Sequence, residues 1–551
     1  MHQRGHFWVR NAACAALLGG LALAVLLPVY GDEIGWRFQE RAGIDGVDKL
    51  FSDLCGPNTL SAPPFFMMPV RWYSAYFNTA FVGPAWIRAS GIAYALALVA
   101  LLGLVVRRLD RPARERAQLL ALGAGLLGLG ALPLLMAWSR PEQPILLCAT
   151  AAILLALADW RAPLRNTARG TAWLRSLAIA LLATIALSYH LKALFLLPVF
   201  ASAILLASRG TAAKWPRLAA GVLLVAVTVW SALYWVQRLQ CPGDPVLQAF
   251  FSAHNIGVEL TGMISIGQVP GVIAKLLGNI RLLDYATLAA PAVEPMAGWL
   301  APGQIGAGAQ RGWRLALNLA WLGAMLVGLI CFVGAVVHAM RERRLPPALL
   351  LSAAAAVSAV GWAGTEYQRN VYEAGFVLPL LALAIVLACA APRASATGSR
   401  LAAAMAILTG LGAVASAGLM AASYGPSLVR ALDTTGHVLP DQPHSVSLTH
   451  YGSARRDILG AARLCGIPEP ARAQGLLVDD ATYPALAEAR LPQHQLGVLG
   501  LWRGTIRDPV AYLKSRKSDG MVVTCALLPP ELRARARTQG QFCCLGPKTG
   551  W

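Results

Sequence analysis

Apolar residues along the chain gather in long blocks that short polar connectors separate. A helix of about 20 apolar residues spans the hydrocarbon core of a bilayer. The first block follows a basic leader, but it is too long for the apolar core of a signal peptide and no small-x-small cleavage site precedes Gly31, so we interpret it as a membrane helix. The pattern predicts eleven spans, at residues 12–30, 89–106, 118–137, 144–158, 174–189, 191–208, 218–236, 313–337, 347–364, 374–391 and 401–422.

Alternate connectors are rich in Arg or Lys and poor in acids: 107–116, 159–175, 208–217, 338–347 and 391–400. Short basic connectors stay on the cytoplasmic side of a membrane. This pattern predicts a multi-pass protein of a bacterial-type plasma membrane, with a cytoplasmic N-terminus and a periplasmic or extracellular C-terminus. The outer face then carries two long loops, at 31–88 and 237–312. Loops of that length in a compact protein tend to be functional.

The chain divides into a membrane domain over 1–422 and a tail over 423–551, which the orientation places outside the membrane. Strand-like and helix-like segments alternate in the tail, which predicts a small extracytoplasmic α/β domain. Asp479 and Asp480 follow one predicted strand and suit either a ligand site or the cap of the next helix. We favour the cap.

Composition supports a membrane protein, because 57% of the 551 residues are hydrophobic, 13% are charged and the mean hydropathy is +0.55. The net charge of +20 is spread over connectors rather than gathered on one soluble face, which speaks against a nucleic-acid partner. Six of the ten cysteines fall in predicted outer segments: Cys55, Cys241, Cys465, Cys525, Cys543 and Cys544. An even set on the oxidising side predicts disulfides, and six cysteines allow 15 pairings.

Three tight connectors on the predicted outer face carry ionisable side chains close to the membrane surface. They read "SRPEQP" with Arg140 and Glu142, "SYHLKA" with His190 and Lys192, and "TEYQRNVYE" at 365–373. Charged groups at that depth are costly and usually face a cavity. Each alone suits a helix-end anchor, but acid, imidazole, amide and cation together favour a site at that face.

Such a mixture suits chemistry on a lipid phosphate. Arg and Lys near the headgroups bind a phosphate, and a carboxylate can take a proton from an acceptor hydroxyl. The acids Asp32 and Glu33 stand directly after the first apolar block. The segment after them places Ile34, Phe38, Val47, Leu50 and Phe51 on a helix that could lie along the membrane and roof a cavity over Asp32.

Asp32-Glu33 after the first span, a long first outer loop, many spans and an outer tail together resemble the GT-C class of membrane glycosyltransferases. The segments "RPEQP", "YHLKALFLLP" and "QRNVYEAGFVLPL" are also similar to that class, over approximately the first 390 residues. The resemblance implies a polyprenyl-phosphate sugar donor in the membrane lipid, and transfer to a glycan, lipid or protein acceptor of the cell envelope.

The resemblance also implies roles for particular residues. The acidic motif falls on Asp32 and Glu33, with Asp32 as the base or a ligand of a divalent cation such as Mg²⁺ or Mn²⁺. The implied phosphate-binding residues are Arg140, His190, Lys192 and Arg369, and the implied substrate contacts are Glu142, Tyr189, His254, Glu366, Gln368 and Glu373. A structural alternative for Asp32 is the N-cap of the following helix.

Other function classes stay open at this point. A transporter or flippase would carry polar residues at mid-span and paired broken helices, which the sequence lacks. A non-catalytic envelope assembly factor, with the tail binding a partner, is compatible with the sequence. A ligase that uses lipid diphosphate donors is an enzymatic alternative.

Overall fold

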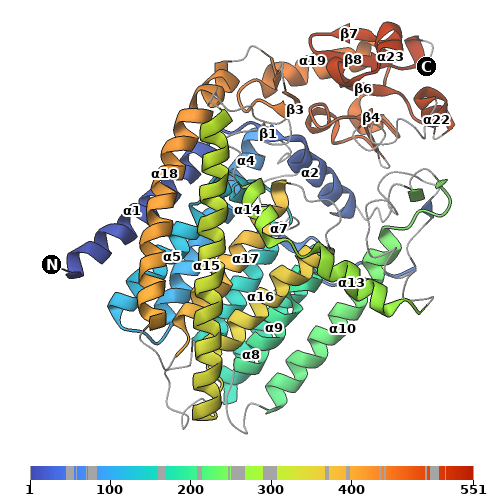
Figure 1. Ribbon diagram of the computed structural model, residues 1–551. Coiled ribbons are helices and arrows are strands. Elements are labelled where there is room, and N and C mark those ends of the chain that lie inside the picture. The colour runs from blue at the N-terminus through green and yellow to red at the C-terminus, as the bar shows by residue number, and fades with distance from the viewer. Residues whose placement is uncertain are drawn as a thin grey trace.

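The computed structural model describes residues 2–44, 55–56, 59–69, 71, 83–158, 169–207, 214–245, 248–249, 267–289, 307–365, 371–392, 397–433, 436–439, 442–490, 493–496, 508–515 and 517–549. Long helices form a bundle, and the C-terminal strands lie over one end of it (Figure 1). The helices that overlap the eleven predicted spans are α1 His2–Ala24, α4 Pro84–Arg108, α5 Ala113–Leu127, α6 Leu132–Met136, α7 Glu142–Leu157, α8 Arg169–Tyr189, η2 Leu191–Leu196, α9 Leu197–Leu206, α10 Lys214–Arg238, α15 Ala307–Glu342, α16 Pro347–Thr365, α17 Ala374–Ala390 and α18 Thr397–Asp433. The short helix η4 Val371–Glu373 directly precedes α17.

Seven of the described helices are long and apolar enough to cross a membrane, and three further apolar helices are shorter. The protein is therefore a multi-pass helical protein, but the predicted number of eleven spans is not confirmed. The predicted span at 118–137 is two helices, α5 and α6, because Gly130 adopts a left-handed φ of +62° between them. The first helix ends at Ala24 rather than at residue 30, four residues before Pro28, whose ring cannot continue a helix.

Helix α17 forms the centre of the bundle. Its residues are apolar on every face, and nearly all of them are buried. It packs against α5, α15 and α16, which enclose it. A helix that is hydrophobic all round belongs in an interior. The short helix η4, which ends at Glu373 directly before α17, is therefore held by a fully enclosed helix.

Helix α2 (Gly31–Ile44) lies between the bundle and the C-terminal strands (Figure 1). Its apolar side chains Ile34 and Phe38 are buried in a cluster with C-terminal residues, and the Phe38 ring lies 5.2 Å from the ring of Tyr483. The expectation that this apolar face rests on the membrane is wrong for Ile34 and Phe38, because it packs against protein. Val47, Leu50 and Phe51 lie outside the described residues. Of the second long loop, α13 (Val269–Asn279) and α14 (Leu282–Leu288) are described.

The C-terminal region contains two small sheets. One has the order β1-β3-β2, formed by β1 Val29–Tyr30, β2 Val438–Leu439 and β3 Gln442–Val446. The other has the order β5-β4-β6-β8-β7, formed by β4 Leu477–Val478, β5 His494–Gln495, β6 Met521–Thr524, β7 Arg537–Gln539 and β8 Phe542–Leu545. Helices α19 Tyr451–Leu464, α20 Tyr483–Leu486, α22 Pro509–Ser515 and α23 Pro530–Arg535 accompany these sheets.

Two features of this sheet region bear on the site. Strand β4 is parallel to β5 and β6, so their carboxyl ends meet at one edge. Strand β1, which directly precedes α2, pairs with β3 with Val29 opposite Val446. The segment that leads into the first loop is therefore part of the C-terminal fold.

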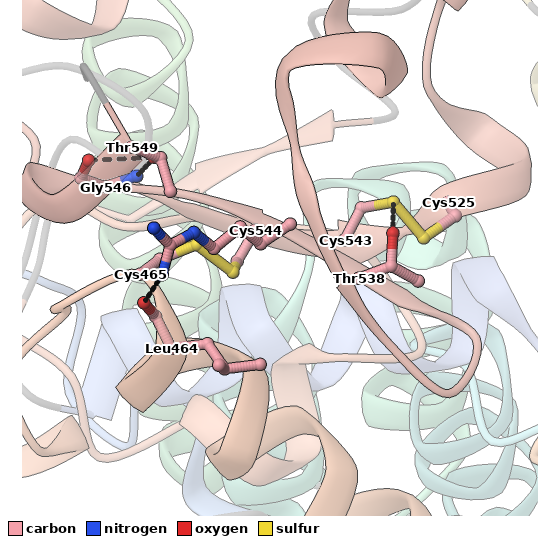
Figure 2. Close-up of a disulfide and its surroundings, with 9 residues drawn as sticks. Leu464, Cys465, Cys525, Thr538, Cys543, Cys544, Gly546 and Thr549 are labelled. Atoms are coloured by element: carbon pink, nitrogen blue, oxygen red, sulfur yellow. Dashed lines mark hydrogen bonds between the residues drawn. A yellow bond between two sulfur atoms is a disulfide. The ribbon is translucent and has the colours of Figure 1, made fainter.

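All six predicted outer cysteines are paired, as Cys55–Cys241, Cys465–Cys544 and Cys525–Cys543. Successive side chains of a strand point to opposite faces, so the neighbours Cys543 and Cys544 of β8 reach different partners on the two sides of the sheet (Figure 2). The remaining bond, Cys55–Cys241, ties the first long loop to the second, and both cysteines are buried.

Replacement of Cys55 by Ser should lower the free energy of unfolding by about 2–4 kcal/mol, because it removes a covalent link across a long loop. The measurement is thermal denaturation of the purified protein in detergent, with Cys14→Ser in α1 as the control that should change little. Non-reducing peptide mapping should recover the Cys55–Cys241 pair from the parent. A free thiol at Cys55 in the parent contradicts the expectation.

Candidate functional site

The two adjacent acids at the start of α2 have different surroundings. Glu33 is fully buried, and its Oε1 lies 2.7 Å from an Arg88 guanidinium nitrogen of α4. The backbone N–H of Ser139 donates to Glu33 Oε2 over 2.8 Å, and the N–H of Tyr30 donates to Oε1 over 3.1 Å. Arg88 in turn donates to the carbonyls of Leu27, Pro28 and Ala137. Glu33 is thus a structural anchor of the helix entry, and its expected catalytic role stays a prediction.

Asp32, unlike Glu33, has a partly exposed side chain. Its side chain is 44% exposed, and its Oδ2 lies 3.3 Å from Nη1 of Arg140. It is inside the first turn of α2 rather than at its N-cap, and the N–H of Tyr30 is taken by Glu33 instead. The capping alternative is therefore wrong, and Asp32 keeps a solvent-reachable carboxylate beside a cation.

From Asp32 a chain of alternating charges runs inward across three separate connectors. Arg140 lies 3.4 Å from Glu142, Glu142 bonds to Lys192, and Lys192 lies 2.7 Å from Glu373. Trp362 donates its indole N–H to the other oxygen of Glu373 over 2.8 Å. Of the predicted site residues, the structure brings together Asp32, Arg140, Glu142, His190, Lys192 and Glu373.

Aromatic rings support the two cations. The guanidinium of Arg140 lies 3.7 Å from the centroid of the Tyr372 ring, and the ammonium of Lys192 lies 4.8 Å from that of Trp362. Cations bind the faces of such rings. Neither ring was predicted from the sequence, although Tyr372 stands next to Glu373 in the predicted outer connector at 365–373.

His190 does not act as a cation. Its Nδ1 accepts the backbone N–H of Lys192 over 3.1 Å, and its ring lies 5.0 Å from that of Trp36. Burial, together with the positive charge of Lys192, lowers the pKa of His190 to about 3. The imidazole is therefore neutral at neutral pH, and the expected contact of His190 with a phosphate stays a prediction. With Nδ1 accepting, the remaining proton is on Nε2.

Tyr189 belongs to a second buried network rather than to the site. Its hydroxyl donates to Glu40 of α2, and Glu40 pairs with Arg37 at 2.5 Å. Arg37 also donates to the hydroxyls of Ser90 and Ser139. This network fixes α2 on the bundle, and the expected substrate contact of Tyr189 is not supported.

The C-terminal sheet brings a further carboxyl to the site. Asp479 caps the following turn, since it accepts the backbone N–H groups of Thr482 and Thr524. Asp479 therefore caps the turn that precedes α20, whereas the N-cap residue of α20 itself is Thr482. The next residue, Asp480, instead faces the start of α2, where a Cβ at Gly31 would overlap its Oδ2.

Asp480 accepts the side-chain amide of Gln495 over 2.6 Å. Its burial, with the negative charges of Asp479 and Asp32 nearby, raises the pKa of Asp480 to about 7. No sequence signal placed Asp480 beside Asp32, because 448 positions separate them along the chain (480 minus 32).

Four of the predicted residues, His254, Glu366, Gln368 and Arg369, lie outside the described residues. Within the described part of the chain, no group of three or more His, Cys, Asp or Glu side chains is arranged to hold a metal ion. Asp32 has a guanidinium as its close partner, so the residues described there do not fit a divalent cation.

No protein-family model and no curated protein matches the chain. Among solved structures, the chain is similar to the crystal structure of ArnT from Cupriavidus metallidurans bound to undecaprenyl phosphate. The two share 13% sequence identity with a TM-score of 0.48, over 98% of this chain and 99% of that chain.

It is also similar to the archaeal oligosaccharyltransferase AglB from Archaeoglobus fulgidus in complex with an inhibitory peptide and a dolichol-phosphate. Here the identity is 12% and the TM-score 0.44, over 95% of this chain and 70% of that chain. Both are GT-C class glycosyltransferases, the class that the sequence resembles. TM-scores below 0.5 assign no family to this chain, and the function proposed below is supported by the site itself.

Neutralisation of the two neighbouring acids should lower the stability of the protein by unequal amounts. Glu33→Gln leaves the buried charge of Arg88 uncompensated and should cost about 3–5 kcal/mol of stability. Asp32→Asn, the matched control one residue away, removes an exposed ion pair worth at most about 1 kcal/mol. Thermal denaturation in detergent compares the two, and equal losses of Tm contradict the assignment of Glu33 as the anchor.

Proposed function

We propose that the chain is a membrane glycosyltransferase that moves a sugar from a polyprenyl-phosphate donor to an acceptor hydroxyl on the outer face of the membrane. The observation that carries the proposal is the pairing of an exposed carboxylate, Asp32, with Arg140 at the end of an apolar helix bundle. The bundle suits a lipid chain, the guanidinium suits a phosphate, and the carboxylate suits the activation of a hydroxyl.

Arg140 is the residue that we assign to the donor phosphate. It is largely buried and stacked on Tyr372, which holds its guanidinium plane. Its buried Nε lies 3.4 Å from Glu142 and makes no hydrogen bond to the described residues, so Glu142 holds the guanidinium by charge alone. A phosphate that binds this guanidinium competes with Asp32 for it. Donor binding would then free the carboxylate for the acceptor.

The reaction follows from these two groups. Asp32 removes the proton of the acceptor hydroxyl as its oxygen attacks the anomeric carbon of the sugar. The new carbon–oxygen bond forms while the bond from the anomeric carbon to the phosphate oxygen breaks, and the polyprenyl phosphate leaves with that electron pair. Arg140 stabilises the charge that develops on the leaving phosphate. Protonated Asp32 then returns its proton to water.

Lys192 receives a different role from the one the resemblance implies. It is 8% exposed and is held by Glu142 and Glu373, so its charge is already balanced. It orders the two carboxylates, and Glu142 in turn orients Arg140. We therefore assign Lys192, Glu142 and Glu373 to positioning the phosphate-binding arginine.

Asp32→Asn should abolish sugar transfer, by at least about 10³-fold, because the amide cannot accept the acceptor proton. The assay incubates purified protein in lipid nanodiscs with a panel of radiolabelled polyprenyl-phosphate sugars and follows release of polyprenyl phosphate. Asp110→Asn, at the connector between α4 and α5, is the exposed-acid control and should keep parental activity. Full activity of Asp32→Asn removes this residue from the mechanism.

Arg140→Lys should weaken binding of undecaprenyl phosphate by roughly 10-fold or more, because an ammonium cannot make the two parallel hydrogen bonds of a guanidinium. Tyr372→Phe keeps the ring under Arg140 and serves as the matched control with near-parental affinity. Binding is measured by the lipid-induced rise in Tm. Unchanged affinity in Arg140→Lys overturns the phosphate assignment.

A further inference from the structure

The carboxyl edge of the C-terminal sheet meets the start of α2 through two glycines. Gly31 and Gly35 are one helical turn apart and share a face of α2. A Cβ at Gly31 would overlap Asp480, and a Cβ at Gly35 would lie 2.8 Å from the amide nitrogen of Gln495. The absence of side chains there lets the sheet edge approach the helix backbone directly.

This approach brings two carboxyls together. Asp480 follows β4, Gln495 ends the parallel neighbour β5, and Asp32 lies in the first turn of α2 beside Gly31. Within the described ranges, Asp480 makes one hydrogen bond, from Gln495, and no ion pair to a cation. The ionisable groups that face it are Asp479, Asp32 and the hydroxyl of Tyr30. If Asp480 served only to pack the sheet edge against α2, an asparagine would do so equally well.

We infer that Asp480, oriented by Gln495, completes the site from the C-terminal sheet and positions a hydroxyl-rich acceptor against Asp32. The inference rests on the proposed function and deepens it. Because the Gln495 amide occupies Oδ1, it leaves Oδ2 of Asp480 toward the start of α2. Two neighbouring hydroxyls of one acceptor can then bond to the two carboxyls, one to be activated by Asp32 and one to be held by Asp480.

The protonation state of Asp480 supports this arrangement. The pKa of about 7 keeps its carboxyl neutral through most of the acid range, so it donates a hydrogen bond without repelling Asp32. Above that pH, Asp480 carries a negative charge and no longer donates a hydrogen bond to the acceptor. Alcohol transfer should therefore fall as pH rises through about 7.

The test compares glycerol, a polyol, with 1-propanol, which has a single hydroxyl. Each alcohol is added to the full chain together with a polyprenyl-phosphate sugar that the protein hydrolyses. The ratio of alkyl glycoside to hydrolysis product is measured from pH 5 to 9. The parent should favour glycerol over 1-propanol by about 10-fold, with the ratio falling above pH 7. Asp480→Ala should lower the glycerol ratio about 10-fold, while the binding of undecaprenyl phosphate stays within twofold.

Asp480→Asn keeps a hydrogen-bond donor, so it should retain much of the glycerol transfer and lose the pH dependence. Gln495→Ala should fall between the parent and Asp480→Ala, and the exposed Glu488→Gln is the control with parental ratios. A parent that hydrolyses the donor without preference for glycerol, or an unchanged ratio in Asp480→Ala, overturns the inference alone. A parent that releases polyprenyl phosphate from no donor overturns the proposed function, and the inference falls with it.

Stability gives a second readout. The pKa of Asp480 is raised on folding, so its stabilising contribution is full below the ordinary carboxyl range and is lost as pH rises through about 7. Asp480→Asn should therefore raise Tm relative to the parent more at pH 8 than at pH 5. A Tm difference that does not vary with pH contradicts the raised pKa of Asp480, whose main cause is burial.

Discussion

The buried ion pair between Glu33 and Arg88 determines where the site lies. Taking two charges out of water is expensive, and a pair inside protein persists only when further hydrogen bonds satisfy its remaining atoms. Here the backbone of residues 27–30 and of 137–139 supplies those bonds. The pair thereby joins the end of the first helix, α4 and the connector before α7 at one point. The pair also fixes the position of Asp32, which directly precedes Glu33 in the chain.

From this anchor, charge alternates in sign through Asp32, Arg140, Glu142, Lys192 and Glu373. Alternation lets ionised groups gather at the end of an apolar bundle, since each charge is compensated by its neighbours. Because of this alternation, an anion that binds Arg140 replaces Asp32 as its partner and leaves the ion pairs among Glu142, Lys192 and Glu373 in place. The inner part of the chain is enclosed and fixed, whereas its outer end is half exposed and able to exchange partners.

The sequence predicts the helical bundle and the gathering of ionisable residues, because both follow from local properties. An apolar block of span length becomes a helix, and a connector too short to leave the surface keeps its charges there. The division of labour between Asp32 and Glu33 could not be predicted, since it depends on Arg88 lying beside one acid and not the other. The same holds for Tyr189, which is held by Glu40, 149 positions earlier, and for the neutral state of His190, which burial decides. Asp480 lay furthest from prediction, because β4 and α2 meet only through the tertiary fold.

The pairing of β1 with β3 has a consequence for biosynthesis. Val29 and Tyr30 leave the ribosome long before their strand partners, Val446 and Ser445, because 417 positions separate Val29 from Val446 (446 minus 29). Contacts between such distant positions form late, because the entropy of closing the intervening loop must be overcome first. In a nascent chain that is still being inserted, the strand β1 that precedes Asp32 therefore lacks its partner β3. The site is supported only after β3 has been made, so products that terminate before Gln442 are expected to lack it.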